Sequence, residues 1–225
     1  MSLDLGELEA LWRERRSMRA FRAEPVPRAT LTEVFAAAQH APSWCNVQPW
    51  RVVVTEPPKT QELAAAMQAA AKTGFPRAEV AFPLDYPEPY KQHRIACGAE
   101  LYRHMGIARE DKAGRYDAWL RNYAFFDAPH VAVVACDRRL GPYAFIDVGL
   151  WLGFVVTAAA ALGLETCPMA SVAAYPDVLR AQLPIGEHDA ILFGLAIGHA
   201  DAGAPANRTR TTRQPVEANV VFVVG

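Results

Sequence analysis

The chain alternates between stretches with helical spacing of hydrophobic residues and shorter stretches with uninterrupted apolar runs. Helical spacing, with apolar positions three or four residues apart, covers residues 5–16, 31–40, 60–72, 145–164 and 175–183. Apolar runs typical of buried strands cover residues 51–55, 128–136, 190–198 and 220–224. Thr30 and Glu33 form a capping-box pattern, which predicts that the second helix starts at Thr30. Together these elements predict one domain, residues 1–225, of the α/β or α+β class.

The pattern breaks between residues 75 and 126. Prolines and aromatic residues make residues 75–90 too irregular for a core element, and two charged helical patterns follow at 91–106 and 109–122. We interpret residues 75–126 as an excursion from the core that forms a lid or a pocket wall. A surface helical hairpin is the simpler alternative.

The apolar run at residues 220–224 needs a partner. An unpaired hydrophobic strand at a chain terminus promotes aggregation unless it joins a sheet edge. Addition to the sheet of a neighbouring subunit would satisfy it, so we expect a homodimer.

Composition and charge exclude several classes of function. With 225 residues and 52% hydrophobic residues the chain can bury a sizeable core, and its net charge of -1 gives no sign of nucleic-acid binding. The four cysteines have no metal-ligand spacing, so we expect no metal. Without a signal-peptide pattern, they are expected to be reduced thiols in the cytoplasm. The apolar segment 148–164 reads as a buried or interface helix, and we expect no membrane span.

Residues 41–50 form a rigid polar loop between the second helix and the first strand. Pro42 and Pro49 restrict the backbone at its two ends. Ser43, Asn46 and Gln48 lie between them and can each donate and accept hydrogen bonds, which suits the edge of a flat heterocycle. A connector in which these side chains only cap the backbone is an equally good interpretation from the loop alone.

Arginines are concentrated near the N-terminus. Arg15 and Arg19, with the hydroxyl of Ser17 between them, could hold a phosphate or the polar edge of a ring. A second basic cluster, Arg208, Arg210 and Arg213, precedes the C-terminal run. The alternative for both clusters is a solvated surface.

The ordered set of motifs resembles the FMN-dependent nitroreductases. The motifs are Arg-Arg-Ser-x-Arg at residues 15–19, Pro-Ser-x-x-Asn-x-Gln-Pro-Trp at 42–50, Asp-x-Gly at 147–149, Pro-Met-Ala at 168–170, the strand ending in Gly198, and Arg-x-Pro at 213–215. The loop, with Tyr90 and the Phe125-Phe126 pair, is most similar to the branch that reduces nitrobenzoates and nitrobenzenes.

The resemblance implies an α+β fold with a central, mostly antiparallel sheet flanked by helices, in an intertwined homodimer with exchanged C-terminal strands. It implies FMN as cofactor, NADPH or NADH as electron donor, and nitroaromatic compounds or quinones reduced in a ping-pong cycle of two-electron transfers. Other acceptors on the same scaffold, through reductive dehalogenation, enone reduction or flavin breakdown, and a non-catalytic flavin-binding protein, remain alternatives.

The resemblance also implies roles for individual residues. The phosphate of FMN would be bound by Arg15, Arg16, Ser17 and Arg213. The cation of Arg19 would face N1 and the C2 carbonyl of the flavin ring, where positive charge favours reduction. The remaining implied flavin contacts are Pro42, Ser43, Trp44 and Asn46 from the partner subunit, Gln48, and the backbone of Pro168, Met169, Ala170 and Ser171, with the Ala170 N–H near N5.

Three positions depart from the pattern of the family. Thr211 stands where many members have a basic residue, and Ser171 where they have glycine. The bulky Trp44 replaces a small residue of the loop. The stacking candidates for an aromatic substrate are Trp44, Tyr90, Tyr123 and Phe125.

Overall fold

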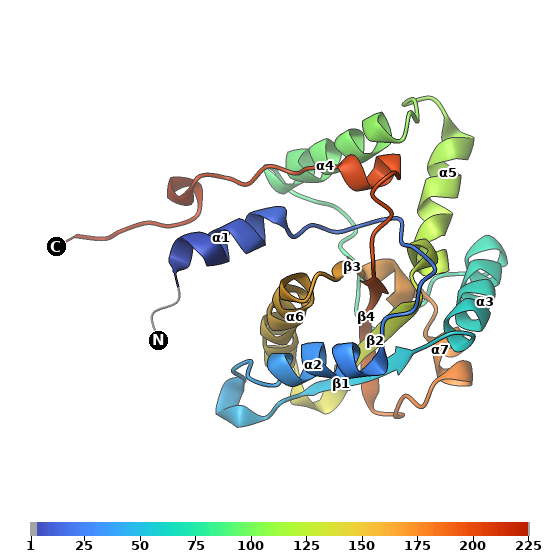
Figure 1. Cartoon of the computed structure of the whole chain (residues 1–225), viewed down its shortest axis with the longest axis horizontal. Helices are drawn as coiled ribbons and strands as arrows, with labels where there is room; N and C mark the ends of the chain where they lie inside the picture. The colour runs from blue at the N-terminus through green and yellow to red at the C-terminus, as the bar shows by residue number, and fades with distance from the viewer. Residues whose placement is uncertain (1–3, 225) are drawn as a thin grey trace.

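A computed structural model, which describes residues 4–224, has a four-stranded sheet with helices packed on both faces (Figure 1). The strand order is β1-β2-β4-β3 and every pairing is antiparallel. The strands are β1 Trp50–Thr55, β2 His130–Asp137, β3 Glu165–Met169 and β4 Asp189–Gly198. The helices are α1 Leu5–Glu14, α2 Arg28–Ala38, α3 Lys59–Thr73, α4 Tyr90–His104, α5 Lys112–Leu120, α6 Tyr143–Ala161 and α7 Pro176–Gln182. This confirms the α+β prediction with a mostly antiparallel sheet.

The two central strands are covered on both faces, which explains their continuous apolar runs. Along β2, Val131, Val133 and Ala135 face a cluster formed with α3 and α7, whereas Ala132 and Val134 face a cluster formed with α2 and α6. A strand buried on both faces needs apolar residues at every position rather than at alternate ones.

The start of α2 corrects one expectation. The helix begins at Arg28, after an N-cap at Pro27, and Thr30 lies inside it without a capping hydrogen bond. The carbonyl of Pro27 already accepts the Leu31 N–H at 3.1 Å. Arg28 and Ala29 are good helix formers, so the helix extends two residues beyond the predicted capping box.

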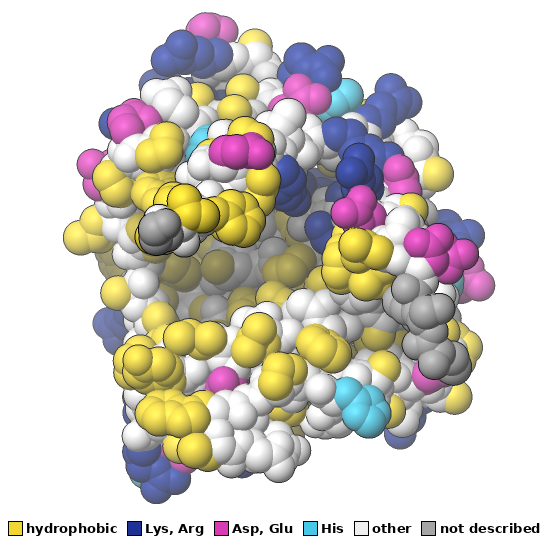
Figure 2. Space-filling view, turned by 90° about the vertical axis from the view of Figure 1, so that its left-hand side faces the viewer, with side chains coloured by type: hydrophobic (Ala, Val, Ile, Leu, Met, Phe, Trp, Pro, Cys, Tyr) yellow, Lys and Arg dark blue, Asp and Glu magenta, His cyan; other side chains and the backbone are white. Residues whose placement is uncertain are grey.

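Helix α6 is long and apolar enough to cross a membrane by length and composition alone. Trp151 and Val155 pack on the sheet, whereas Ile146, Leu150 and Phe154 on the other side are exposed. Figure 2 views the molecule from the side where both termini lie and shows hydrophobic side chains around a broad hollow. The helix is apolar on both its buried side and its exposed side, a pattern typical of a helix that packs on the core and against a second subunit.

The C-terminal run forms no strand in the single chain. Residues 220–224 lead outward to the C-terminus (Figure 1), and Val221, Phe222, Val223 and Val224 are each more than four-fifths exposed. Each β-strand needs a partner edge, and residues 220–224 reach none within residues 4–224.

Candidate functional site

The site is built on β3, because the arginine-rich segment after α1 runs along that edge strand. Ser17 pairs with Thr166 in a parallel bridge, and the Met18 N–H donates to the Thr166 carbonyl at 3.1 Å. Burial raises the pKa of the Cys167 thiol to about 11, opposed by the charge of Arg19 and a hydrogen bond with Ser17. Ser17 and Arg19 therefore both lie beside β3.

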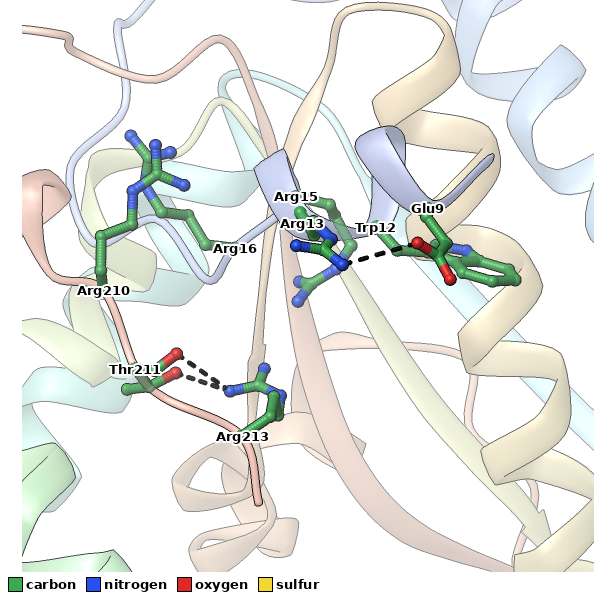
Figure 3. Close-up of a pocket in the computed structure, with 8 residues that line it drawn as sticks. All are labelled: Glu9, Trp12, Arg13, Arg15, Arg16, Arg210, Thr211 and Arg213. Carbon is green, nitrogen blue, oxygen red and sulfur yellow. Dashed lines mark hydrogen bonds and ion pairs between the residues drawn. The ribbon is translucent and has the colours of Figure 1, made fainter. Parts of the chain in front are cut away.

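A basic cavity of about 410 Å³ opens between the end of α1 and the C-terminal segment (Figure 3). The C-terminal segment of residues 210–214 is called the strap below. All eight lining residues come from α1, the segment directly after it, or the strap, and five of the eight are arginines. The lining residues are Glu9, Trp12, Arg13, Arg15, Arg16, Arg210, Thr211 and Arg213.

Two of these arginines have no carboxylate partner among residues 4–224. Burial and the nearby charge of Arg213 lower the pKa of Arg15. Arg213 donates only to the strap itself, at 2.9 Å to the Thr211 Oγ1. By contrast, Arg16 and Arg210 both lie within 4 Å of Glu14, at 3.9 and 3.0 Å. Two adjacent guanidinium groups without a counter-charge favour a bound dianion such as a phosphate monoester.

Asn207 holds the arginine segment in place, and sequence reasoning missed it. Its Oδ1 accepts the Arg19 N–H at 2.7 Å, and its Nδ2 donates to the carbonyls of Ala20 and Asp201 at 2.8 and 2.9 Å. Its own carbonyl accepts Arg16 Nε at 3.2 Å. The side chain is 5% exposed and satisfies its hydrogen-bonding groups only through tertiary contacts, which no local sequence signal reveals.

Arg19 lines a smaller cavity, of about 110 Å³, on the side of the excursion. Leu101, Tyr102 and Met105 at the end of α4 and Trp119 of α5 form its wall. The excursion therefore packs close to Arg19.

The end of β3 presents small residues to the surface. Pro168 and Ala170 are exposed, whereas Met169 between them is buried. Ala170 is the first residue of a 3-10 helix, Ala170–Ala174, a position whose N–H has no acceptor within the helix. The Ser171 Oγ is buried and has no hydrogen-bond partner among residues 4–224.

The loop of residues 42–48 lies apart from the basic cavity, beside the N-terminal part of α6. The Trp44 N–H donates to Asp147 Oδ1 at 3.1 Å, and the Trp44 ring lies 4.8 Å from that of Tyr143. Internal bonds shape the loop: the Gln48 N–H donates to Ser43 Oγ at 3.0 Å. Pro42, Trp44, Asn46 and Gln48 are exposed, and none of them lines the basic cavity. A single chain thus does not bring the two predicted halves of the site together.

The predicted substrate aromatics divide into two groups. Trp44 and Tyr90 are exposed, and Tyr90 lines a cavity with Arg213. Tyr123 and Phe125, at 2% and 0% exposed, are core residues. Burial and the neighbouring Tyr175 raise the pKa of Tyr123. The expectation that these two side chains offer a stacking surface is therefore corrected: in the single chain they pack into the core at the end of the excursion.

Proteins of known family are similar to this chain in sequence. Residues 12–199 match the model of the Nitroreductase family. The chain belongs to the nitroreductase family. A 4-nitrobenzoate reductase from Nocardioides sp. (strain LMS-CY) is 34% identical over 96% of this chain and 89% of its own length. A nitrobenzene nitroreductase from Ectopseudomonas oleovorans is 32% identical over 96% of each chain.

Solved structures of nitroreductases have the same fold. The crystal structure of the FMN-dependent nitroreductase NfnB from Mycobacterium smegmatis, in complex with NADPH, superposes with a TM-score of 0.90 at 32% identity, covering 98% of this chain and 100% of that one. An FMN and NADPH-dependent NfnB from Sphingopyxis sp. strain HMH superposes with a TM-score of 0.92 at 36% identity, covering 97% and 99%. The nitroreductase fold predicted from the motifs is confirmed.

Proposed function

We propose that this nitroreductase binds FMN and uses NAD(P)H to reduce nitroaromatic compounds. The observation that carries the proposal is that Arg15 and Arg213, which have no carboxylate partner among residues 4–224, line one cavity. That donor set fits the phosphate of FMN. The names of the relatives favour nitroaromatic acceptors over dehalogenation, enone reduction or flavin storage.

The residues along β3 would hold the cofactor from phosphate to ring. Arg15, Arg213 and the Ser17 hydroxyl would bind the phosphate, with Arg16 and Arg210 adding positive charge. Arg19 would lie beside N1 and the C2 carbonyl, where a cation favours electron uptake. The open surface of Pro168 and Ala170 would lie against the ring, with the Ala170 N–H available to N5 and the backbone of Met169 and Ser171 continuing that surface.

When bound, FMN would take hydride from NAD(P)H and deliver it to the nitro group, and the protons that this reduction consumes would come from water, so the chain itself would need to supply no acid or base. No group of His, Cys, Asp or Glu side chains within residues 4–224 could hold a metal ion. The role of the chain would be to orient both substrates on one face of the flavin ring. Trp44 and Tyr90 would stack on an aromatic substrate. The excursion, residues 75–126, would form a wall of the substrate pocket.

A second subunit would complete the site. The loop with Pro42, Ser43, Trp44, Asn46 and Gln48 lies apart from its own chain's basic cavity, on the far side of a helix whose outer face is apolar. Pairing two α6 faces would bury Ile146, Leu150 and Phe154 and bring one chain's loop toward the other's arginines. The exposed residues 220–224 would then join the partner's sheet. All four cysteines are free thiols, in keeping with a cytoplasmic homodimer.

Comparison of FMN with riboflavin tests the phosphate site directly. Arg15→Ala and Arg213→Ala are each expected to weaken FMN binding about tenfold to a hundredfold, because each removes a charge-assisted hydrogen bond of about 1.5–3 kcal/mol. Riboflavin lacks the phosphate, so its affinity should stay unchanged. Arg28→Ala, which removes an exposed arginine of α2, is the control. Equal losses for both flavins would contradict the assignment.

A further inference from the structure

A second arginine-rich cavity lies between α4, the loop that follows it and α5. It has a volume of about 750 Å³, and its cations are Arg94 and Arg103 on α4, Arg109 in the following loop, and Arg115 on α5. No carboxylate lines it. We call it the α4–α5 groove.

Aromatic rings rather than acids hold two of these arginines. The guanidinium carbon of Arg94 lies 5.2 Å from the ring centre of Tyr86, and that of Arg115 lies 5.0 Å from the ring centre of Tyr102. Arg115 also donates to the carbonyl of Arg109 at 3.2 Å. Cation–π stacking fixes a guanidinium without neutralising it, so its charge stays available to a ligand.

Only one cation of the groove is neutralised by an ion pair within residues 4–224. Arg103 pairs with Glu100 at 2.7 Å, whereas Arg94, Arg109 and Arg115 have no carboxylate partner there. Three available cations around a wall of small and apolar residues, Ile95, Gly98, Ala99 and Ile107, suit a ligand that combines a dianionic phosphate with a flat apolar ring.

The groove adjoins the proposed flavin site through shared wall residues. Tyr102 lines both the groove and the small cavity of Arg19. Cys97 lines both the groove and a cavity of about 710 Å³ that contains Arg213 and Tyr90. A long ligand whose reacting end lies at the flavin could therefore place its other end over α4.

We propose that the α4–α5 groove binds the 2′-phosphate and adenine of NADPH. The inference rests on the proposed function, because it assigns the distal end of that reaction's electron donor. NADPH carries a phosphate monoester where NADH has a hydroxyl, so the available arginines would set a preference for NADPH. Arg94 and Arg115 are the residues that would determine this specificity.

Coenzyme kinetics of the FMN-loaded protein test the proposal. Arg94→Gln/Arg115→Gln is expected to raise KM for NADPH at least tenfold, to leave KM for NADH within twofold, and to leave FMN content unchanged. Arg28→Gln/Arg139→Gln, which removes two exposed cations outside the groove, should change neither KM. An equal change for both coenzymes, or none, would overturn the proposal.

Calorimetry with nucleotide fragments gives a readout that needs no turnover. Adenosine 2′,5′-bisphosphate should bind at least tenfold more tightly than adenosine 5′-monophosphate, and the double variant should abolish the difference. Equal binding of the two nucleotides would show a nonspecific anion surface and refute the assignment. If the protein bound no FMN or oxidised neither coenzyme, the proposed function would fail, and this titration would still decide the groove separately.

Discussion

Single side chains at this site act through contacts between distant parts of the chain. Asn207 fixes the backbone at Arg19 and Ala20 across almost 190 positions of sequence. The sequence motifs predicted Arg15, Ser17 and Arg213 as phosphate ligands because phosphate binding needs particular residue types, and the structure brings Arg15 and Arg213 to one cavity. They did not identify Asn207, because a buried amide that bonds to backbone groups has no distinguishing neighbours in sequence.

Replacement of Asn207 by alanine is expected to lower the free energy of unfolding by about 2 to 4 kcal/mol, because buried backbone groups of Arg19 and Ala20 lose their partners. Urea denaturation of the flavin-free protein measures it. Asn219→Ala, at an exposed position, should change the value by less than about 0.5 kcal/mol. A similar small effect at Asn207 would show that the amide is dispensable.

His130 predicts a pH dependence of stability. Burial lowers its pKa, and the neutral ring accepts the Val26 N–H at Nε2, 2.9 Å away, while Nδ1 lies 3.2 Å from the Thr55 carbonyl. Below the ordinary histidine pKa of about 6.5 the unfolded chain binds a proton that the folded chain resists, so stability falls as pH decreases. His130→Gln should show a weaker decrease in unfolding free energy between pH 8 and pH 5. Identical slopes would assign the effect to other groups.

At the scale of elements, one carboxylate anchors the first part of the excursion to the sheet. Glu79 accepts the Ile191 N–H at 2.9 Å and pairs with Arg138 and Arg180, each at 2.8 Å. Burial raises the pKa of Glu79, but hydrogen bonds from Ile191, Arg180 and Arg138 outweigh it, and the net pKa is lowered. This carboxylate ties residues 75–90 to the start of β4.

Glu79→Ala is expected to destabilise the fold by about 2 to 4 kcal/mol, because the partly buried Arg180 and the Ile191 N–H lose their acceptor. Thermal or urea unfolding measures the change. Glu187→Ala removes an exposed carboxylate from the neighbouring loop and should have little effect. If both variants unfolded alike, Glu79 would have no anchoring role.

Periodicity predicted most elements, and tertiary context decided the rest. The sequence pattern located β2 and β4, because strands covered on both faces need continuous apolar residues. It placed the start of α2 too late, since the backbone at Pro27 and Arg28 was already suitable for a helix. It assigned Tyr123 and Phe125 to a substrate surface, because aromatic residues near a lid have the same local signature as aromatic residues beneath one.

The molecule as a whole has an apolar side that a single chain leaves open. The outer face of α6, the Trp44 side chain and residues 220–224 are exposed in the described part of the chain, while the basic cavity is already formed. The resemblance predicted this division of the site between two chains, and the exposure of these surfaces agrees with it. The dimer itself stays a prediction.

Val221→Asp/Val223→Asp is expected to shift the protein from dimer to monomer at micromolar concentration, because charges on the exchanged strand oppose its burial in the partner sheet. Light scattering after size exclusion measures the mass. Val216→Asp changes an exposed residue before that strand and should leave the dimer intact. A dimer that persisted in the double variant would rule out strand exchange as its main support.

The most direct measurement is an anaerobic visible spectrum of the FMN-reconstituted protein, recorded before NADPH, after NADPH, and again after a nitrobenzoate is added. We expect the flavin absorbance to disappear with NADPH and to return as the nitro group is consumed. Failure to retain flavin would contradict the cofactor site. Bleaching without recovery on adding the nitro compound would contradict nitroaromatic reduction.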